Sequence, residues 1–325
     1  MKLKIGKKMD KYEAYEKYLD YEEAALTQYA GRSNPRPVRK NKKKPAVTMA
    51  ALTDFVDDAS AWVPTYAASL DPKHHERQWL IDSLASFYQD NVLTDVTRRV
   101  KGGKEANVYC CTAHPATDVD MIAAKLYRPR MLRTLKNDAI YKSGRQLRGE
   151  DGKELKGRRE KLALAQKTNF GKHLDMVWWI NNEFSVQQKL FEAGADVPRP
   201  IGHNGNTILM EFVGDEWLPA PTLSDVSLSP EEARNLLQMV LKNIRLMLDN
   251  HFVHGDLSAF NILYWEGSIS IIDFPQVVDA RTNPHAQSLL MRDVKRVCDY
   301  FARYKAKSNP EEISREMWLA YMGTL

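Results

Sequence analysis

A change of pattern near residue 213 divides the chain into a strand-rich part and a helix-rich part. Apolar and alternating runs at residues 92–96, 107–112 and 120–127 predict an antiparallel sheet, and residues 207–213 predict a further strand. Amphipathic helical patterns predominate after that point. We therefore expect an α+β fold with two lobes, an antiparallel sheet with one helix followed by a small, mainly helical lobe.

Helical patterns and their end signals surround this division. Residues 75–90 predict one helix, and a second carries Val177, Ile180, Phe184 and Phe191 on one face and stops at Gly194. A capping box at residues 229–232 opens a long helix. The expected organisation is a basic, largely disordered tail at 1–50 with room for one helix, a helical extension at 51–90, the first lobe at 91–212 with a basic insert at 128–172, and the second lobe at 213–325.

Charge is unevenly distributed along the chain. Residues 1–45 hold 13 Lys and Arg against 6 Asp and Glu, and residues 128–161 hold 12 against 5. Such segments attract phosphate-rich partners, so residues 36–44 and 128–161 are candidates for binding RNA, with solvated tails as the alternative. No apolar run reaches 18 residues, no secretory signal is evident, and three cysteines form no zinc spacing. We therefore expect a cytoplasmic protein without a membrane span.

The strongest chemical signal is the run HGDLSAFN at residues 254–261, between a helix and a strand. Phosphoryl transfer needs a carboxylate that orients the attacking hydroxyl and a nearby oxygen ligand for magnesium. Asp256 and Asn261 can supply both groups from one loop. The alternative is a turn in which the two side chains satisfy local backbone groups.

Asp273 strengthens this interpretation, because it ends an apolar strand 12 residues after Asn261. A kinase fold places its main magnesium ligand at such a position. Magnesium prefers hard oxygen ligands, so an Asp–Asn pair together with phosphate oxygens suits it. The expected cofactors are ATP and Mg²⁺, with Mn²⁺ as a substitute. Taken alone, Asp273 would be a turn or capping residue.

Earlier in the chain, residues 101–109 (KGGKEANVY) place two glycines in a turn between strands, where backbone amides can approach phosphates. Lys125 lies within an apolar strand, where a lysine is costly unless it pairs or binds an anion. In a kinase fold this lysine meets ATP phosphates and an acid on the next helix, for which Glu183 is the candidate. A snorkelling lysine and a solvent-facing glutamate are the alternatives.

Residues 209–213 end the last strand of the first lobe. There a kinase fold presents backbone N–H and C=O groups to adenine, which makes Glu211 and Val213 candidate contacts. Met210 would line the back of the same pocket. A buried strand without a ligand is the alternative.

Together, GKEANVY at residues 103–109, HGDLS at 254–258 and IDFPQ at 272–276 resemble the RIO family of atypical protein kinases. Residues 284–286 and 292–294 resemble the closing segment of that family. The resemblance covers about residues 75–305. The overall residue pattern of the chain is similar to that of bacterial members of the family.

The resemblance implies a trimmed protein-kinase-like fold without a substrate-binding helical subdomain or an activation segment. Only 52 residues follow Asp273, in agreement with this expectation. It implies that Asp256 is the catalytic aspartate, that Asn261 and Asp273 bind the metal, and that Lys125 pairs with Glu183. Members are serine/threonine kinases tied to small-subunit ribosome maturation, which makes a ribosomal particle a candidate partner.

Lys104 is implied to touch the phosphates. Some features depart from the family pattern. Lys101 and Gly102 replace the usual Ser-Thr, which argues against autophosphorylation in the turn. Ser258 stands where ordinary serine/threonine kinases carry a lysine, which removes one positive charge near the transferred phosphate.

Three functions remain open from the sequence. The first is Mg-ATP-dependent phosphorylation of protein serine or threonine, including self-phosphorylation. The second is an ATPase that passes through a phosphoaspartate at Asp273 and acts as a switch in ribosome or RNA assembly. The third is a small-molecule kinase of the aminoglycoside or choline type, which the short C-terminal region disfavours.

Overall fold

A computed structural model of the chain describes residues 77–103, 106–128 and 169–323. The chain divides into two units, Met1–Trp62 and Val63–Leu325, and every described residue belongs to the second. Lys104, the basic tail and nearly all of segment 128–161 lie outside the described residues. None of the described helices combines the length and apolar character needed to cross a membrane.

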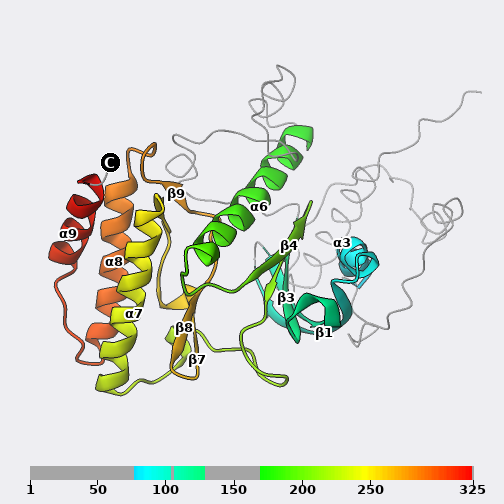
Figure 1. Cartoon of the computed structure of the whole chain (residues 1–325), viewed down its shortest axis with the longest axis horizontal. Helices are drawn as coiled ribbons and strands as arrows, with labels where there is room; N and C mark the ends of the chain where they lie inside the picture. Colours follow the sequence, from blue (N-terminus) through cyan, green and yellow to red (C-terminus); the bar gives the residue numbers. More distant parts are fainter. Residues whose placement is uncertain (1–76, 104–105, 129–168, 324–325) are drawn as a thin grey trace, which may run out of the picture. The chain divides into compact units, whose positions relative to one another are not determined.

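The strand-rich part forms one five-stranded antiparallel sheet with the order β1-β2-β3-β5-β4. This confirms the predicted antiparallel sheet, although its first strand is longer than the apolar run at 92–96 indicated. Its strands are β1 (Leu93–Gly102), β2 (Ala106–Ala113), β3 (Met121–Tyr127), β4 (Pro200–Asn204) and β5 (Thr207–Glu211). Figure 1 labels β1, β3 and β4 of this sheet.

Five longer helices accompany the sheet within the described residues: α3 (Arg77–Gln89), α6 (Asn169–Glu192), α7 (Pro230–Asp249), α8 (Ala286–Ala302) and α9 (Pro310–Met322). The predicted capping box opens α7, since the Ser229 side chain accepts from the Glu232 amide and the Glu232 side chain accepts from the Ser229 amide. Gly194 follows the end of α6 with a φ of +82°, a left-handed conformation that favours glycine.

One expectation for α6 is wrong. Phe191 belongs to the apolar face predicted for this helix, but its side chain is 40% exposed. Leu190, one residue earlier, is fully buried and takes the inward position at the end of the helix. Because neighbouring helical residues point about 100° apart, Phe191 is turned toward solvent.

Alternation along β3 directs its side chains to two opposite faces of the sheet. Ala124 and Leu126 pack in one apolar cluster with residues of α3. Tyr127 packs with Ile180 of α6 in another. Side chains two positions apart share a face of a strand, so Lys125 projects to the side of the sheet that α6 covers.

The second lobe is built around α7, α8 and α9, which lie side by side (Figure 1). Leu236 and Val240 of α7 and Val294 and Phe301 of α8 belong to its main core. Leu190 of α6 joins the same core. The middle of α6 therefore contacts the sheet while its C-terminal end packs into the helical lobe.

Short strands complete this lobe and carry the polar loops of the site. They are β6 (Phe252–Val253), β7 (Ile262–Trp265), β8 (Ser268–Ile271) and β9 (Val278–Asp279), with β6 pairing β9 and β7 pairing β8. Residues 254–261 connect β6 to β7, and Asp273 follows β8. The segments that carry the motifs are therefore the connections between these short strands.

Candidate active site

Lys125 contacts Glu183, the acid that the sequence suggested as its partner, and also Asp273, which the sequence suggested as a metal ligand. Its Nζ lies 2.7 Å from Glu183 Oε1 and 2.7 Å from Asp273 Oδ1. The Glu183 side chain is 2% exposed, whereas that of Asp273 is 43% exposed. The structure therefore brings together three residues that are far apart in the chain, with a buried pair on one side and an accessible pair on the other.

Tyr127 holds the second oxygen of Glu183, a contact that the sequence reasoning missed. Its hydroxyl donates to Glu183 Oε2, and Lys125 Nζ lies 5.1 Å from the centre of its ring. Burial and the Glu183 carboxylate raise the pKa of Tyr127, which keeps the hydroxyl protonated as a donor. The two-residue spacing from Lys125 could have revealed this residue, because it places both side chains on one face of β3.

The charges in this cluster support one another. Burial alone would lower the pKa of Lys125, but the Asp273 and Glu183 carboxylates outweigh it and raise that pKa well above its ordinary value. Burial would likewise raise the pKa of Asp273, but the Lys125 ammonium outweighs it and lowers that pKa. Both groups are therefore charged at neutral pH.

Asp273 adopts an uncommon backbone conformation with a φ of +75°. Left-handed conformations of non-glycine residues cluster at functional sites and persist where their surroundings hold them. Phe274, which follows, is 1% exposed within the core of the helical lobe. This buried ring anchors the chain directly after Asp273 and helps to keep the carboxylate beside Lys125.

Asn261 links the two ends of the predicted catalytic segment. Its side-chain Nδ2 donates to the Asp256 carbonyl at 3.0 Å, and its own carbonyl accepts from the Ile272 amide at 3.0 Å. The carboxamide orientation leaves Oδ1 as the side-chain atom of Asn261 that can bind a cation. Asp256, Asn261 and the residue before Asp273 are thus tied together by hydrogen bonds.

His254 is a structural part of the same loop. Its Nε2 lies 3.2 Å from the Ile272 carbonyl oxygen, and its ring centre lies 5.4 Å from that of Phe274. Burial lowers the pKa of His254, so its imidazole is neutral at pH 7. We infer that it supports the loop and does not act as a cation.

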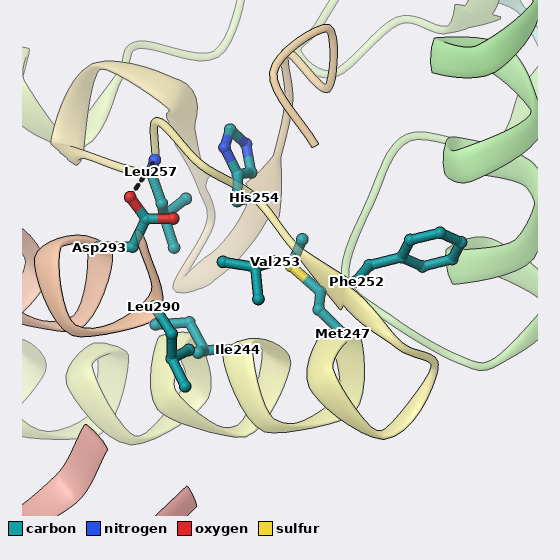
Figure 2. A pocket seen from close by; sticks show the side chains of 8 residues that line it. All are labelled: Ile244, Met247, Phe252, Val253, His254, Leu257, Leu290 and Asp293. Atoms are coloured by element: carbon teal, nitrogen blue, oxygen red, sulfur yellow. Dashed lines mark hydrogen bonds between the residues drawn. The ribbon is translucent and has the colours of Figure 1, made fainter. Parts of the chain in front are cut away.

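The Asp293 side chain of α8 binds the backbone of the loop at residues 254–261, and sequence reasoning gave Asp293 no role of its own. Its carboxylate accepts from the Gly255 amide at 2.7 Å and from the Leu257 amide at 3.2 Å, the second of which Figure 2 shows. Gly255 has a φ of +79°, as this turn requires. Burial raises the pKa of Asp293 to about 7, although the Gly255 amide opposes the shift.

A small cavity lies beneath this loop, between α7, β6 and α8 (Figure 2). Its volume, measured as the space open to the centre of a water molecule, is about 10 Å³. That space is close to the minimum for a single water and too small for a nucleotide. Its lining comprises Ile244, Met247, Phe252, Val253, His254, Leu257, Leu290 and Asp293. The cavity is a gap in packing and does not serve as the ligand site.

The junction between the lobes contains the residues expected to face adenine. Met210 packs against the cluster around Ile180, with its Sδ 3.7 Å from Gln187 Nε2. The Glu211 amide donates to the Arg199 carbonyl, which leaves that N–H unavailable to a ligand. The Val213 carbonyl accepts from Ala220 at 2.9 Å, whereas no backbone acceptor in the described part of the chain takes the Val213 amide.

Asp273 and Asn261 are the side chains that could hold a divalent cation. Among residues 77–103, 106–128 and 169–323, no three His, Cys, Asp or Glu side chains are grouped to hold a metal. Asp273 is nevertheless ionised and accessible, and Asn261 retains a carboxamide oxygen nearby in the chain. Two hard oxygen donors suit Mg²⁺ if phosphate oxygens and water complete the coordination. The residues therefore fit a cation that arrives with a nucleotide.

An antiparallel sheet with a lysine–glutamate pair, followed by an Asp–Asn loop and a late aspartate, defines a two-lobed protein-kinase-like fold. The family comparison narrows this class. The family model described as "RIO domain" matches residues 107–313, well over half of the chain. The chain therefore belongs to the RIO domain family.

Relatives from eukaryotes and archaea agree with this assignment. Serine/threonine-protein kinase RIO1 of Homo sapiens is 34% identical over 215 residues, which cover 66% of this chain and 34% of the relative. Serine/threonine-protein kinase rio1 of Schizosaccharomyces pombe is 29% identical over 226 residues, covering 69% and 41%. RIO-type serine/threonine-protein kinase Rio2 of Methanocaldococcus jannaschii is 36% identical over 141 residues, covering 43% and 51%.

The chain spans between about a third and two fifths of the length of its human and yeast relatives. The bacterial-type character suggested by the texture of the sequence stays a prediction, as do the cytoplasmic location, the domain boundaries and the contact of RNA or a ribosomal particle with segments 36–44 and 128–161.

Proposed function

We propose that this chain transfers the γ-phosphoryl group of ATP, with Mg²⁺, to a serine or threonine hydroxyl of a protein, its own chain included. The observation that carries the proposal is Lys125 Nζ, which lies 2.7 Å from both the buried Glu183 and the accessible Asp273. Such a lysine, held by one acid and placed beside another, is suited to bind nucleotide phosphates. The names of the RIO relatives support the same reaction class.

The chain's own residues have separate tasks in this reaction. Lys125 binds the α- and β-phosphate oxygens while Glu183 keeps its ammonium in place. Asp273 and Asn261 would hold Mg²⁺, which neutralises charge on the phosphate oxygens when bound. Asp256 orients the acceptor hydroxyl and receives its proton as the oxygen attacks phosphorus. Met210 and the Val213 amide would face the adenine.

The test measures the transfer of label from γ-labelled ATP by the full chain. The reaction contains Mg²⁺ and an acceptor protein that offers both serine and threonine hydroxyls. We expect acid-stable label on hydroxyl groups. Asp256→Asn should lower the rate by at least about 100-fold because it loses the group that orients the hydroxyl. It should still show the thermal shift that ATP and Mg²⁺ produce, whereas Asp273→Ala should lose most of that shift.

Other outcomes would point away from this function. Acid-labile, hydroxylamine-sensitive label on the chain would favour the phosphoaspartate ATPase, since an acyl phosphate forms at a carboxylate. Label on an aminoglycoside or choline, and none on protein, would favour a small-molecule kinase. Equal turnover by Asp256→Asn and the natural chain would refute the catalytic role of Asp256.

A further inference from the structure

The catalytic loop lacks a cation of its own at a position where the proposed reaction develops negative charge. In phosphoryl transfer, charge spreads over the three equatorial oxygens of the group in flight, and cations stabilise it. Ser258, two residues after Asp256, provides only a hydroxyl. Lys125 is already held by Glu183 and Asp273 on the nucleotide side. A positive charge on the acceptor side must therefore come from outside the loop.

Helix α8 delivers a guanidinium to this place. Arg296 Nη1 lies 2.7 Å from Asp256 Oδ1. The two side chains are 42% and 41% exposed, so a phosphate group and a substrate can reach both. A guanidinium carries five donors in a planar fork, and this contact uses one of its nitrogens.

The position of Arg296 is set by the residue that anchors the loop. Asp293 lies three residues earlier on α8, so the two side chains share one face of the helix. Asp293 accepts from the amides of Gly255 and Leu257, on either side of Asp256. Arg292, on the same helix, donates to the Gly255 carbonyl. The helix that fixes the loop backbone thereby also fixes the guanidinium against the catalytic carboxylate.

An exposed ion pair of this kind contributes little to folding stability, because water and salt screen it. A structural role is therefore a weak explanation for a contact at 2.7 Å between Arg296 and Asp256. Arginine is, by contrast, well matched to phosphate oxygens because its planar donors can bind two oxygens together.

We propose that Arg296 is a catalytic residue that binds a non-bridging oxygen of the transferred phosphoryl group. It would take the role of the lysine that ordinary serine/threonine kinases carry at the position of Ser258. This inference rests on the proposed function. As the bond between the acceptor oxygen and phosphorus forms, the bond between phosphorus and the ADP oxygen breaks and the hydroxyl proton passes to Asp256. Arg296 remains protonated throughout and donates hydrogen bonds to the oxygens that gain charge.

The experiment compares steady-state label transfer by the natural chain, R296Q and the double variant S258K/R296Q. We expect R296Q to lower kcat by about 10- to 100-fold, at or below the lower end of the loss for one charge-stabilising donor, because the site is partly exposed. KM for ATP should change less than about threefold, since nucleotide binding depends on other residues. S258K/R296Q should recover part of the lost rate, because it returns a cation to the loop.

K295Q is the matched control, because Lys295 is the neighbouring cation on α8 and pairs with Asp299, away from the loop. Its kcat should stay within about twofold of the natural chain. Unchanged or increased kcat in R296Q would overturn the inference and identify a structural or inhibitory ion pair. Failure of S258K to raise the rate of R296Q would also overturn it. An inactive natural chain would instead refute the proposed function, and this inference with it.

Discussion

Replacement of Lys125 by methionine tests how much the buried ion pair between Lys125 and Glu183 contributes to the free energy of unfolding. Among the described residues, the change leaves the Tyr127 hydroxyl as the remaining hydrogen-bond partner of Glu183, which is 2% exposed. Removal of one partner of a buried pair costs about 3–5 kcal/mol. We expect about 3 kcal/mol here, because Tyr127 retains its bond. The lost contact to Asp273, which is 43% exposed, adds at most about 1 kcal/mol after solvent screening.

For a folded unit of this size, a loss of about 3 kcal/mol lowers Tm by about 6–12 °C. Urea denaturation followed by tryptophan fluorescence gives the free energy of unfolding, and the double variant K125M/E183Q supplies the decisive comparison. Since glutamine removes the uncompensated charge, the double variant should recover more than half of the loss. A stability of K125M within about 0.5 kcal/mol of the natural chain, or no recovery in the double variant, would refute the reasoning.

Two further predictions concern the supports of the site. Because burial raises the pKa of Asp293 to about 7, the folded chain holds a proton between about pH 4 and 7 that the unfolded chain releases, so stability from this group is greatest at low pH and falls as pH rises. From pH 5 to 8 the natural chain should lose about 3 kcal/mol relative to D293N in urea denaturation. Separately, S229A should cost about 1 kcal/mol in the same assay, since it removes the cap of α7.

Each of these has its own control. His254, whose pKa is lowered by burial, adds the opposite slope at acidic pH, but it is present in both the natural chain and D293N and cancels in their difference. Parallel pH profiles of the two would contradict the pKa of Asp293. For the cap, S227A removes an exposed hydroxyl just before the helix, and equal stability of S227A and S229A would show that the capping box contributes nothing.

The sequence pattern alone singled out Lys125, because a lysine within an apolar strand conflicts with its surroundings, whereas Glu183 and Asp273 were assigned from their positions relative to a kinase fold. A lysine within an apolar strand is costly unless its charge is paired, whereas an aspartate at the end of a strand would, taken alone, be a turn or capping residue. The alternation of β3 and the boundaries of β8 then determine where these side chains emerge. The helix ends at Ser229 and Gly194 were predictable for the same local reason.

The contacts that sequence reasoning missed come from residues distant in the chain. Asp293 and Arg296 lie on an ordinary amphipathic helix, whose pattern shows which side is buried but not which loop it supports. Their partners, Gly255 and Asp256, lie some 40 residues earlier. Such pairing depends on how α8 packs against the loop, and that packing is set by the whole core of the lobe.

Burial separates the ion pairs of the site into those that stay and those that can exchange. Lys125–Glu183 is closed to solvent on the acid side, so breaking it would strand a buried carboxylate. The pairs Lys125–Asp273 and Arg296–Asp256 each have a carboxylate that is more than 40% exposed, and their exchange for new partners costs little. Under the proposed function, a nucleotide with its cation would take Asp273 from Lys125, and a phosphoryl group would bind the remaining donors of Arg296, while the buried pair keeps the lysine aligned. In this proposal, ligands replace the exposed ion-pair partners and the core does not rearrange.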